Sequence, residues 1–231
     1  MGSLLLSLAV SAHLALPSDL VAYLPLNGSG FEAVQQRSAE VRAGAISHPN
    51  RDGFHFDGQT GVVALADAGE YGVDGSFSVA AVVQPDSVPS WNGQIVFRGD
   101  DRGAIDNYSL SLGSDGFFTF MFDQPNGERA SLRVPARIGQ AQALLGTFDR
   151  HRSRMRLWVD GEVVAQTWVP SGPVSAMIAD YRPGLSVGNV QAPEAGVHRQ
   201  PFQGWIRDVR VYRTEREWSS LESLPTIWTR H

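Results

Sequence analysis

The chain has 231 residues, of which 42% are hydrophobic and only 19% are charged, with 24 glycines and 13 prolines. These proportions are typical of short strands joined by tight turns and argue against long helices. The net charge of −5 argues against a nucleic-acid surface or an anionic membrane surface. Cysteine is absent, which excludes a disulfide framework and any role for a thiol.

Residues 1–16 contain an apolar run, Leu4 to Val10, followed by the small residues Ser11 and Ala12. This pattern resembles an export leader, although the usual positive n-region is missing. The same residues also fit a first strand or short helix of the domain, and the sequence leaves both interpretations open. The run is too short for a transmembrane helix. No later segment is apolar for long enough, so we expect no membrane insertion.

The rest of the chain is predicted to consist of short strands with a spacing near ten residues. Residues 76–84 alternate at first and then become continuously apolar, as in a central strand covered on both faces. Residues 31–47 have the weakest pattern and are predicted to be a loop with one short strand. The predicted strands are 19–26, 41–46, 53–57, 62–65, 76–84, 94–98, 108–112, 117–122, 130–134, 143–148, 154–159, 162–168, 185–188 and 203–212.

Two Asp-Gly pairs predict hairpin turns. Asp160-Gly161 stands between two alternating segments, where a type I′ turn needs positive φ at both central positions. Asp57-Gly58 predicts a second hairpin between residues 53–57 and 62–65. The antiparallel sheet around the first pair is therefore the centre of the predicted fold.

The strand at 154–159 has two different faces. Met155 and Leu157 point to one side, which we expect to be buried. Arg154, Arg156 and Trp158 point to the other side, and we interpret the arginine cluster at 150–156 as a solvated strand face and turn.

Near the C-terminus, a single helix is predicted. In residues 214–224, Thr214 is followed three residues later by Glu217, which is the pattern of a helix cap. With one short C-terminal helix and otherwise only strands, the sequence predicts an all-β, two-sheet antiparallel β-sandwich. No composition break marks a linker, so we expect residues 17–231 to form a single domain.

The order of these segments resembles the laminin G-like and pentraxin-like jelly roll of the concanavalin A-like lectin/glucanase superfamily. The most specific segments are the hairpin WVDG at 158–161 and the strand GWIRDVRVY at 204–212. The resemblance covers about residues 19–225. It implies the fold more strongly than a function, because this fold carries lectins, adhesion modules and glycanases.

Calcium is the cofactor that the resemblance implies. In pentraxin-like members an adjacent Asp-Asn before a strand supplies ligands, and Asp106 and Asn107 occupy that place here, with Gln200 as a further amide ligand. The acidic ligands expected after residues 185–188 are absent, because Asn189 and Gln191 stand there instead. We therefore expect at most one calcium site. Asp106 and Asn107 are also plausible as loop residues that cap backbone groups.

The sequence shows no catalytic motif. A retaining glycanase on this fold needs two carboxylates on one strand face, and the chain has no Glu-x-Asp-x-x-Glu pattern. Sugar binding instead uses aromatic rings beside polar groups. The candidate ligand-binding residues are Trp91, Trp168, Trp205 and Arg207, each of which also fits a packing role.

We therefore expect a non-catalytic carbohydrate-binding module, secreted or at the cell surface, that recognises a glycan through the loops at the sandwich edge. A calcium ion is expected to assist it. The sequence leaves two alternatives: a module for protein interaction, adhesion or structure, with a surface protein as its partner, and a glycan hydrolase or lyase with an unfamiliar site.

Overall fold

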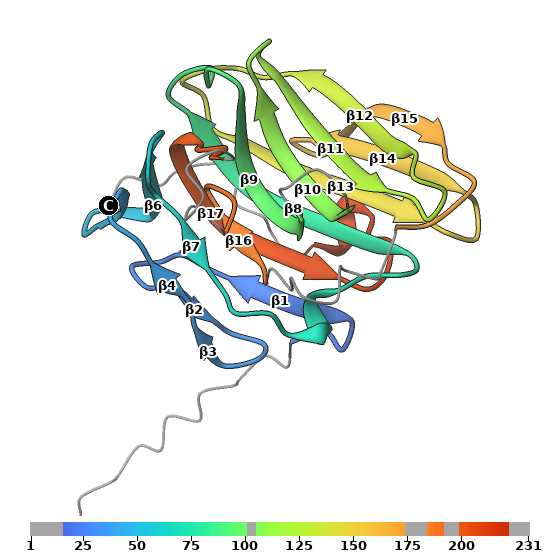
Figure 1. The fold of residues 1–231 in the computed structure, drawn as a ribbon, viewed down its shortest axis with the longest axis horizontal. Helices are drawn as coiled ribbons and strands as arrows, with labels where there is room; N and C mark the ends of the chain where they lie inside the picture. Colours follow the sequence, from blue (N-terminus) through green and yellow to red (C-terminus); the bar gives the residue numbers. More distant parts are fainter. Residues whose placement is uncertain (1–15, 101–104, 174–183, 192–198, 222–231) are drawn as a thin grey trace, which may run out of the picture.

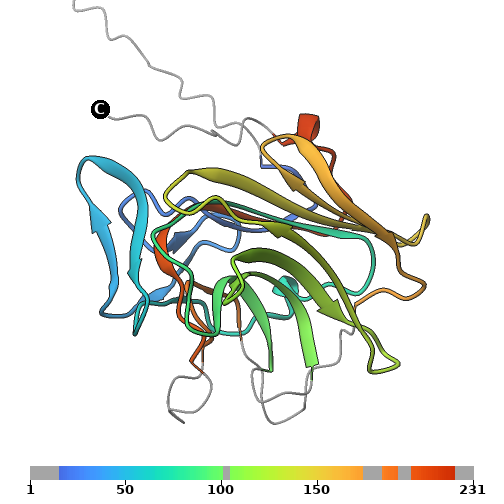
Figure 2. The ribbon, with the colours of Figure 1, turned by 90° about the horizontal axis from the view of Figure 1, so that it is seen from above.

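In a computed structural model, the chain forms two large antiparallel sheets that lie face to face (Figures 1 and 2). The structure describes residues 16–100, 105–173, 184–191 and 199–221. The all-β sandwich predicted from the alternating segments is confirmed. No helix among the described residues is both long and apolar enough to cross a membrane.

The first sheet has eight strands in the order β15-β14-β13-β8-β17-β6-β5, with β1 paired to β17 beside this path. Its longest strand, β17, lies between β8 and β6 and joins the two halves of the sheet. The bounds are β1 Leu20–Leu24, β5 Ala45–His48, β6 Arg51–Asp57, β8 Phe77–Pro85, β13 Gln142–Asp149, β14 Arg154–Val159, β15 Glu162–Trp168 and β17 Gln203–Tyr212.

The second sheet has seven strands in the order β12-β11-β10-β9-β16-β7-β4. A separate pair, β2 with β3, and a 3-10 turn, η1, complete the part of the chain before β8. The bounds are β2 Phe31–Glu32, β3 Arg37–Ser38, β4 Glu40–Val41, β7 Val63–Ala64, η1 Gly69–Tyr71, β9 Asn92–Asp100, β10 Ile105–Gly113, β11 Phe117–Asp123, β12 Arg129–Pro135 and β16 Ser186–Val187.

The main core fills the space between the two sheets. Rings from both sheets meet in it, with Phe77 and Phe148 of the first sheet against Phe120 and Phe122 of the second at centroid distances of 5.0–5.7 Å. Burial of these alternating apolar side chains is the main force that holds the sheets together.

A second, smaller apolar layer covers the outer face of the first sheet. Ala80 and Val82 of β8 lie there with Leu145 and Trp158, and Leu221 near the C-terminus packs over them. β8 is therefore covered on both faces, as its continuously apolar sequence predicts, and eight of its nine residues are buried.

The Asp160-Gly161 turn is confirmed in detail. Both residues have positive φ, 51° and 95°, and they join β14 to β15. Asp160 also accepts a hydrogen bond from the Ala143 N–H at 2.8 Å through Oδ1, which fixes the turn against the neighbouring strand.

Three sequence predictions about local structure are wrong. Residues 53–57 and 62–65 do not form a hairpin, because β6 belongs to the first sheet and β7 to the second. The helix predicted at 214–224 is absent from its described part, which holds only a 3-10 turn, η3 Trp218–Ser220. The Arg156 side chain is buried, although a solvated face is predicted for the arginine cluster at 150–156.

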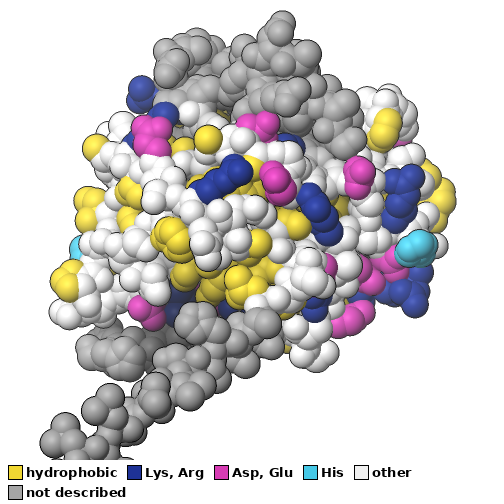
Figure 3. Space-filling view, turned by 90° about the horizontal axis from the view of Figure 1, so that it is seen from below, with side chains coloured by type: hydrophobic (Ala, Val, Ile, Leu, Met, Phe, Trp, Pro, Cys, Tyr) yellow, Lys and Arg dark blue, Asp and Glu magenta, His cyan; other side chains and the backbone are white. Residues whose placement is uncertain are grey.

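Two further expectations concern the loop at residues 31–47 and the two ends of the chain. Residues 31–47 hold four short strands where the sequence predicts one. The leader predicted at residues 1–16 falls, up to residue 15, outside the described part of the chain, as do residues 222–224 of the predicted helix. Figure 3 shows the face to which β1, β2 and β3 belong, with apolar side chains in the middle and basic and acidic side chains intermixed around them.

Candidate functional site

A small pocket lies at the end of the sandwich where β8 turns into β9. The Trp91 ring at its edge is 78% exposed, the highest value among the large hydrophobic residues of the described chain. The cavity has a volume of about 110 Å³. We call it the Trp91 pocket, and it is lined by Gly58, Ser87, Val88, Pro89, Ser90, Trp91, Asn92, Arg199, Pro201 and Gln203.

Hydrogen bonds from the neighbouring strands hold the polar groups of the Trp91 pocket in place. Ser87 Oγ donates to Gln203 Oε1 at 2.6 Å, which ties the β8–β9 loop to the start of β17. Asn92 Nδ2 donates to Gln200 Oε1 at 2.8 Å. The exposed Trp91 ring is therefore flanked by amide and hydroxyl groups whose positions are set by the two sheets.

Trp205 and Arg207 lie on the first sheet, in β17. The Trp205 ring packs against Arg51, whose Cζ is 3.9 Å from the ring centroid, and against the His48 and His55 rings at 5.0 and 5.3 Å. Arg207 is 5% exposed, and this burial lowers its pKa. Ligand binding by these two residues stays a prediction.

Trp168, at the end of β15, is 69% exposed. It is the register partner of Arg154, so the two side chains share the outer face of the first sheet. Arg154 is paired in turn with Asp149, next to the start of β8. Trp91 follows the end of the same strand, which has nine residues and is therefore roughly 30 Å long. The two exposed tryptophans thus occupy opposite ends of the sandwich.

The three residues predicted to bind calcium do not lie together. Asp106 lies opposite Gly99 of β9. Gln200 lies beside Gln94, which is five residues earlier in β9 and donates its backbone N–H to the Gln200 carbonyl. About 16 Å of strand therefore separates Asp106 from Gln200.

Protein groups already contact one side-chain oxygen atom of each of these three residues, and Asn92 and Gln94 donate to the Gln200 oxygen. Asn107 is fully buried, and its Oδ1 accepts from the Val73 N–H and from Arg98. Asp106 forms an ion pair of 3.0 Å with Arg129. Among the described residues, no group of three His, Asp or Glu side chains is arranged to hold a metal ion. These residues therefore do not fit one calcium shell, and calcium elsewhere on the chain stays a prediction.

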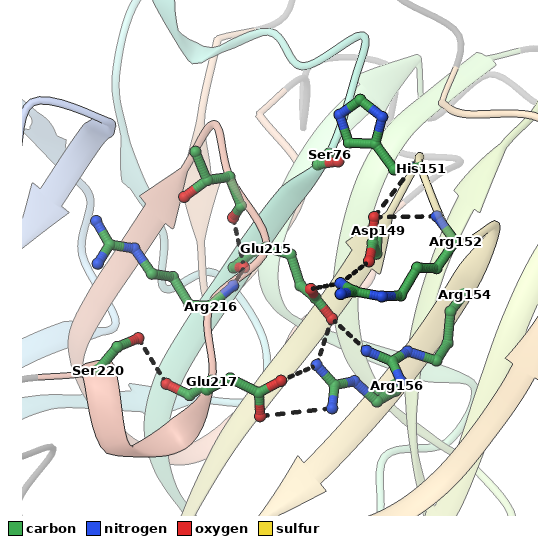
Figure 4. A network of polar contacts seen from close by, with 12 residues as sticks. Ser76, Asp149, His151, Arg152, Arg154, Arg156, Glu215, Arg216, Glu217 and Ser220 are labelled. Carbon is green, nitrogen blue, oxygen red and sulfur yellow. Dashed lines mark hydrogen bonds and ion pairs between the residues drawn. The ribbon is translucent and has the colours of Figure 1, made fainter.

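A second polar surface forms where the β13–β14 turn meets the segment after β17 (Figure 4). Its open space has a volume of about 660 Å³. We call it the arginine hollow, and it is lined by Gly75, Ser76, Asp149, Arg150, His151, Arg152, Arg213, Thr214 and Glu215.

Glu215 is the centre of the ion pairs beside the arginine hollow. Its carboxylate contacts Arg156, and lies 3.3 Å from Arg154 and 3.9 Å from Arg152. Glu217 pairs with Arg156 at 2.7 Å. These contacts explain why the predicted cap pattern forms no helix: both glutamates are drawn onto the sheet by arginines about sixty residues earlier in the chain.

Asp149 closes the turn at the edge of the arginine hollow. Its side chain is 4% exposed, and burial alone would raise its pKa. Hydrogen bonds from the Arg152 guanidinium and from the backbone N–H groups of Arg152 and His151 outweigh this effect and lower the pKa. Asp149 therefore stays ionised and fixes Arg152 on the rim.

Most of these polar groups are missing from the sequence prediction. Ser87, Asn92 and Gln203 have no motif, because their grouping depends on loops of two sheets. The arginine cluster at 150–156 is visible in the sequence, but its partners Glu215 and Glu217 are too distant along the chain to be assigned.

Comparison with known proteins supports the fold. A laminin G-type family model, described as concanavalin A-like lectin/glucanases superfamily, matches residues 57–221. No curated protein matches the sequence.

Several solved structures share the architecture at low identity. A Trypanosoma rangeli sialidase is 17% identical with a TM-score of 0.61, over 90% of this chain and 32% of its own. The receptor binding domain of a botulinum neurotoxin C/D mosaic is 13% identical with a TM-score of 0.60, over 86% of this chain and 49% of its own. The chain spans about a third of the sialidase and half of the neurotoxin domain.

A smaller domain aligns over a larger share of its own length. The CBM40 domain of a Ruminococcus gnavus IT-sialidase, solved with alpha2,3 sialyllactose, is 17% identical with a TM-score of 0.53, over 64% of this chain and 81% of its own. At these identities the likeness shows the fold alone. The family match over residues 57–221, together with the two-sheet jelly roll, shows that this chain belongs to the concanavalin A-like lectin/glucanases superfamily.

Proposed function

We propose that the protein is a non-catalytic carbohydrate-binding module that recognises a glycan, or a glycosylated surface outside the cell, through the Trp91 pocket. The observation that carries the proposal is the Trp91 ring, 78% exposed beside a pocket of fixed polar groups. Exposure of so large an apolar ring costs free energy in water, and a ligand that covers the ring recovers it.

The chemistry of the pocket suits a sugar. The C–H face of a pyranose stacks on an aromatic ring, while its hydroxyl groups need donors and acceptors at the rim. Asn92, Gln203 and Ser87 supply amide and hydroxyl groups there, and Arg199 adds a cation. The volume of about 110 Å³ holds only part of a sugar residue, so we expect polysaccharides to bind better than monosaccharides.

The superfamily and the structural neighbours support this proposal. One neighbour was solved with sialyllactose, which makes sialyllactose one of the ligands to test. The sequence has no Glu-x-Asp-x-x-Glu pattern, and the two carboxylates beside the arginine hollow, Glu215 and Glu217, are engaged by Arg156. For this reason the proposal is a binding module and not a hydrolase.

The test is binding of the whole chain to a glycan array and to cellulose, xylan and dextran, together with sialyllactose. Trp91→Ala should weaken binding by about tenfold or more, because it removes the stacking ring. Trp168→Ala is the matched control for the neutral polysaccharides, since it removes another exposed tryptophan at the far end of the sandwich. Thermal melts of both variants should match the parent, because neither ring is in the core.

Two outcomes would overturn the proposal. If the parent protein binds none of the glycans tested, the proposed function is wrong. If Trp168→Ala loses binding of the neutral polysaccharides while Trp91→Ala binds them fully, the Trp91 pocket is not the binding site.

Calcium binding is a separate proposal, made from the family resemblance. A higher Tm in calcium than in chelator would support it, and equal Tm values would contradict it.

A further inference from the structure

The arginine hollow has more positive than negative groups. Three arginines line it, at positions 150, 152 and 213, against two carboxylates at positions 149 and 215. The surplus among the lining residues is one positive charge, in a chain whose net charge is −5. A surplus of this sign on an acidic protein requires an explanation.

The two arginines without an acidic partner are Arg150 and Arg213. The ion pairs of the described residues include Arg152, Arg154 and Arg156, each with at least one carboxylate, but neither of these two. Both side chains are exposed, and both line the hollow. Each guanidinium group has five N–H donors, and one of them binds a backbone carbonyl.

Backbone contacts hold both guanidinium groups in position. Arg150 Nη1 donates to the Asp74 carbonyl oxygen at 2.8 Å, and Arg213 Nη2 donates to the Glu70 carbonyl oxygen at 2.9 Å. A carbonyl oxygen orients a guanidinium without neutralising it. The Arg150 backbone N–H also donates to Ser76 Oγ at 3.0 Å, which fixes the turn below it. The donors are thus partly preorganised for a further acceptor.

We propose that the arginine hollow is a second binding site, which takes the oxyanion of an acidic sugar, either a carboxylate or a sulfate ester, on Arg150 and Arg213. Planar guanidinium groups bind such oxyanions with two parallel hydrogen bonds. The cavity of about 660 Å³ is large enough for a sugar residue and not only for a bare ion.

The surroundings of the hollow fit a sugar as the carrier of the charge. Trp168 is 69% exposed and shares the sheet face with Arg154, which forms one side of the Glu215 cluster. An aromatic ring thus lies on the same sheet face as Arg154, beside the Glu215 cluster. Choosing a sugar as the ligand class rests on the proposed function, whereas binding of an oxyanion rests only on the hollow itself.

The experiment measures binding of three polymers to the whole chain: dextran, dextran sulfate and polygalacturonate. Sulfate and glucuronate ions are titrated separately by NMR. The test variant is Arg150→Gln/Arg213→Gln. The matched control is Arg42→Gln/Arg133→Gln, which removes one half-buried and one exposed arginine elsewhere and changes the net charge by the same amount.

We expect at least one acidic polymer to bind more tightly than dextran. Its affinity should fall by about tenfold or more in the test variant, and remain unchanged in the control. Added salt should weaken this binding. Dextran sulfate and polygalacturonate distinguish a sulfate ester from a carboxylate. Neutral glycans should bind at the Trp91 pocket equally well in the parent, the test variant and the control variant. The two proposed binding sites can therefore be tested independently of each other.

Three results would overturn the inference. One is that no acidic polymer binds better than dextran. The second is that the test variant and the control lose the same affinity, which would indicate a general charge effect. The third is that free sulfate binds while neither glucuronate nor either acidic polymer does, which would exclude a sugar as the carrier.

Discussion

At the scale of single residues, Asp57 shows how one carboxylate directs the chain between the sheets. Its Oδ1 accepts hydrogen bonds from the backbone N–H groups of Gln59, Thr60 and Gly61 at 2.8–3.0 Å, and its Oδ2 accepts from Thr60 Oγ1 at 3.0 Å. These bonds stabilise a wider turn than a two-residue hairpin. The chain therefore leaves β6 in the first sheet and enters β7 in the second.

Asp57→Asn should lower stability in a pH-dependent manner. Burial alone would raise the Asp57 pKa, but the hydrogen bonds outweigh it and hold the pKa below the ordinary value of 3.8. A carboxyl whose pKa is lower in the folded state contributes stability above its unfolded pKa, and this stability is lost as the pH falls through the folded pKa. We expect a loss of about 1 kcal/mol at pH 7.

Urea unfolding of the parent and the variant between pH 2.5 and 7 measures this effect. The two curves should converge at the acid end. Asp74→Asn, at an exposed position, is the control and should change little at any pH. A difference between parent and Asp57→Asn that is constant across the pH range would contradict the assigned cause.

At the scale of elements, the segment after β17 acts as a cover for the first sheet and not as a helix. Leu221 packs on the outer apolar layer, and Glu215 and Glu217 pair with Arg156. The predicted helix would gain one backbone hydrogen bond per residue. The extended segment instead neutralises the buried Arg156, whose isolation would cost more.

The two glutamates of this segment should differ in their contribution. The Glu215 side chain is 14% exposed and is shared by three arginines, whereas Glu217 is 52% exposed and pairs with one. We expect Glu215→Gln to cost about 2 kcal/mol, because it leaves arginines near the sheet without their carboxylate. Glu217→Gln should cost less than about 1 kcal/mol, since the Glu217 side chain is half exposed and Arg156 keeps its contact with Glu215. Equal losses in urea unfolding would argue against this account.

At the scale of the whole molecule, the two sheets share one core and depend on close contact across it. Gly146 of β13 lies against the Phe120 ring of β11, and a Cβ at position 146 would lie 2.4 Å from that ring. The absence of a side chain at this position therefore allows the central strands of the two sheets to approach each other.

Gly146→Ala should destabilise the protein by about 2 kcal/mol, because the core has no room for the added methyl group. Unfolding should remain a single transition, since the core belongs to both sheets. Gly69→Ala makes the same change where no atom lies within 4 Å, and it should stay within about 0.5 kcal/mol of the parent. Calorimetry checks both expectations. A Gly146→Ala protein as stable as the parent would show that the sheets separate easily.

The sequence by itself determined the strands and the Asp160-Gly161 turn, because both depend on local properties. Alternation of side chains has a period of two residues, and positive φ at 160 and 161 depends on those residues alone. The order of the strands was sufficient to indicate the jelly roll and the superfamily.

Only the tertiary structure decided which strands pair, which charges are buried and which polar groups meet. Asp57-Gly58 has the same local pattern as Asp160-Gly161, yet the chain crosses to the other sheet there. Arg156 is buried by a glutamate 59 positions away, and Trp91 and Trp168 lie at opposite ends of the sandwich. These features arise from contacts between distant segments, whose free energies exceed the local preferences that a sequence pattern reports.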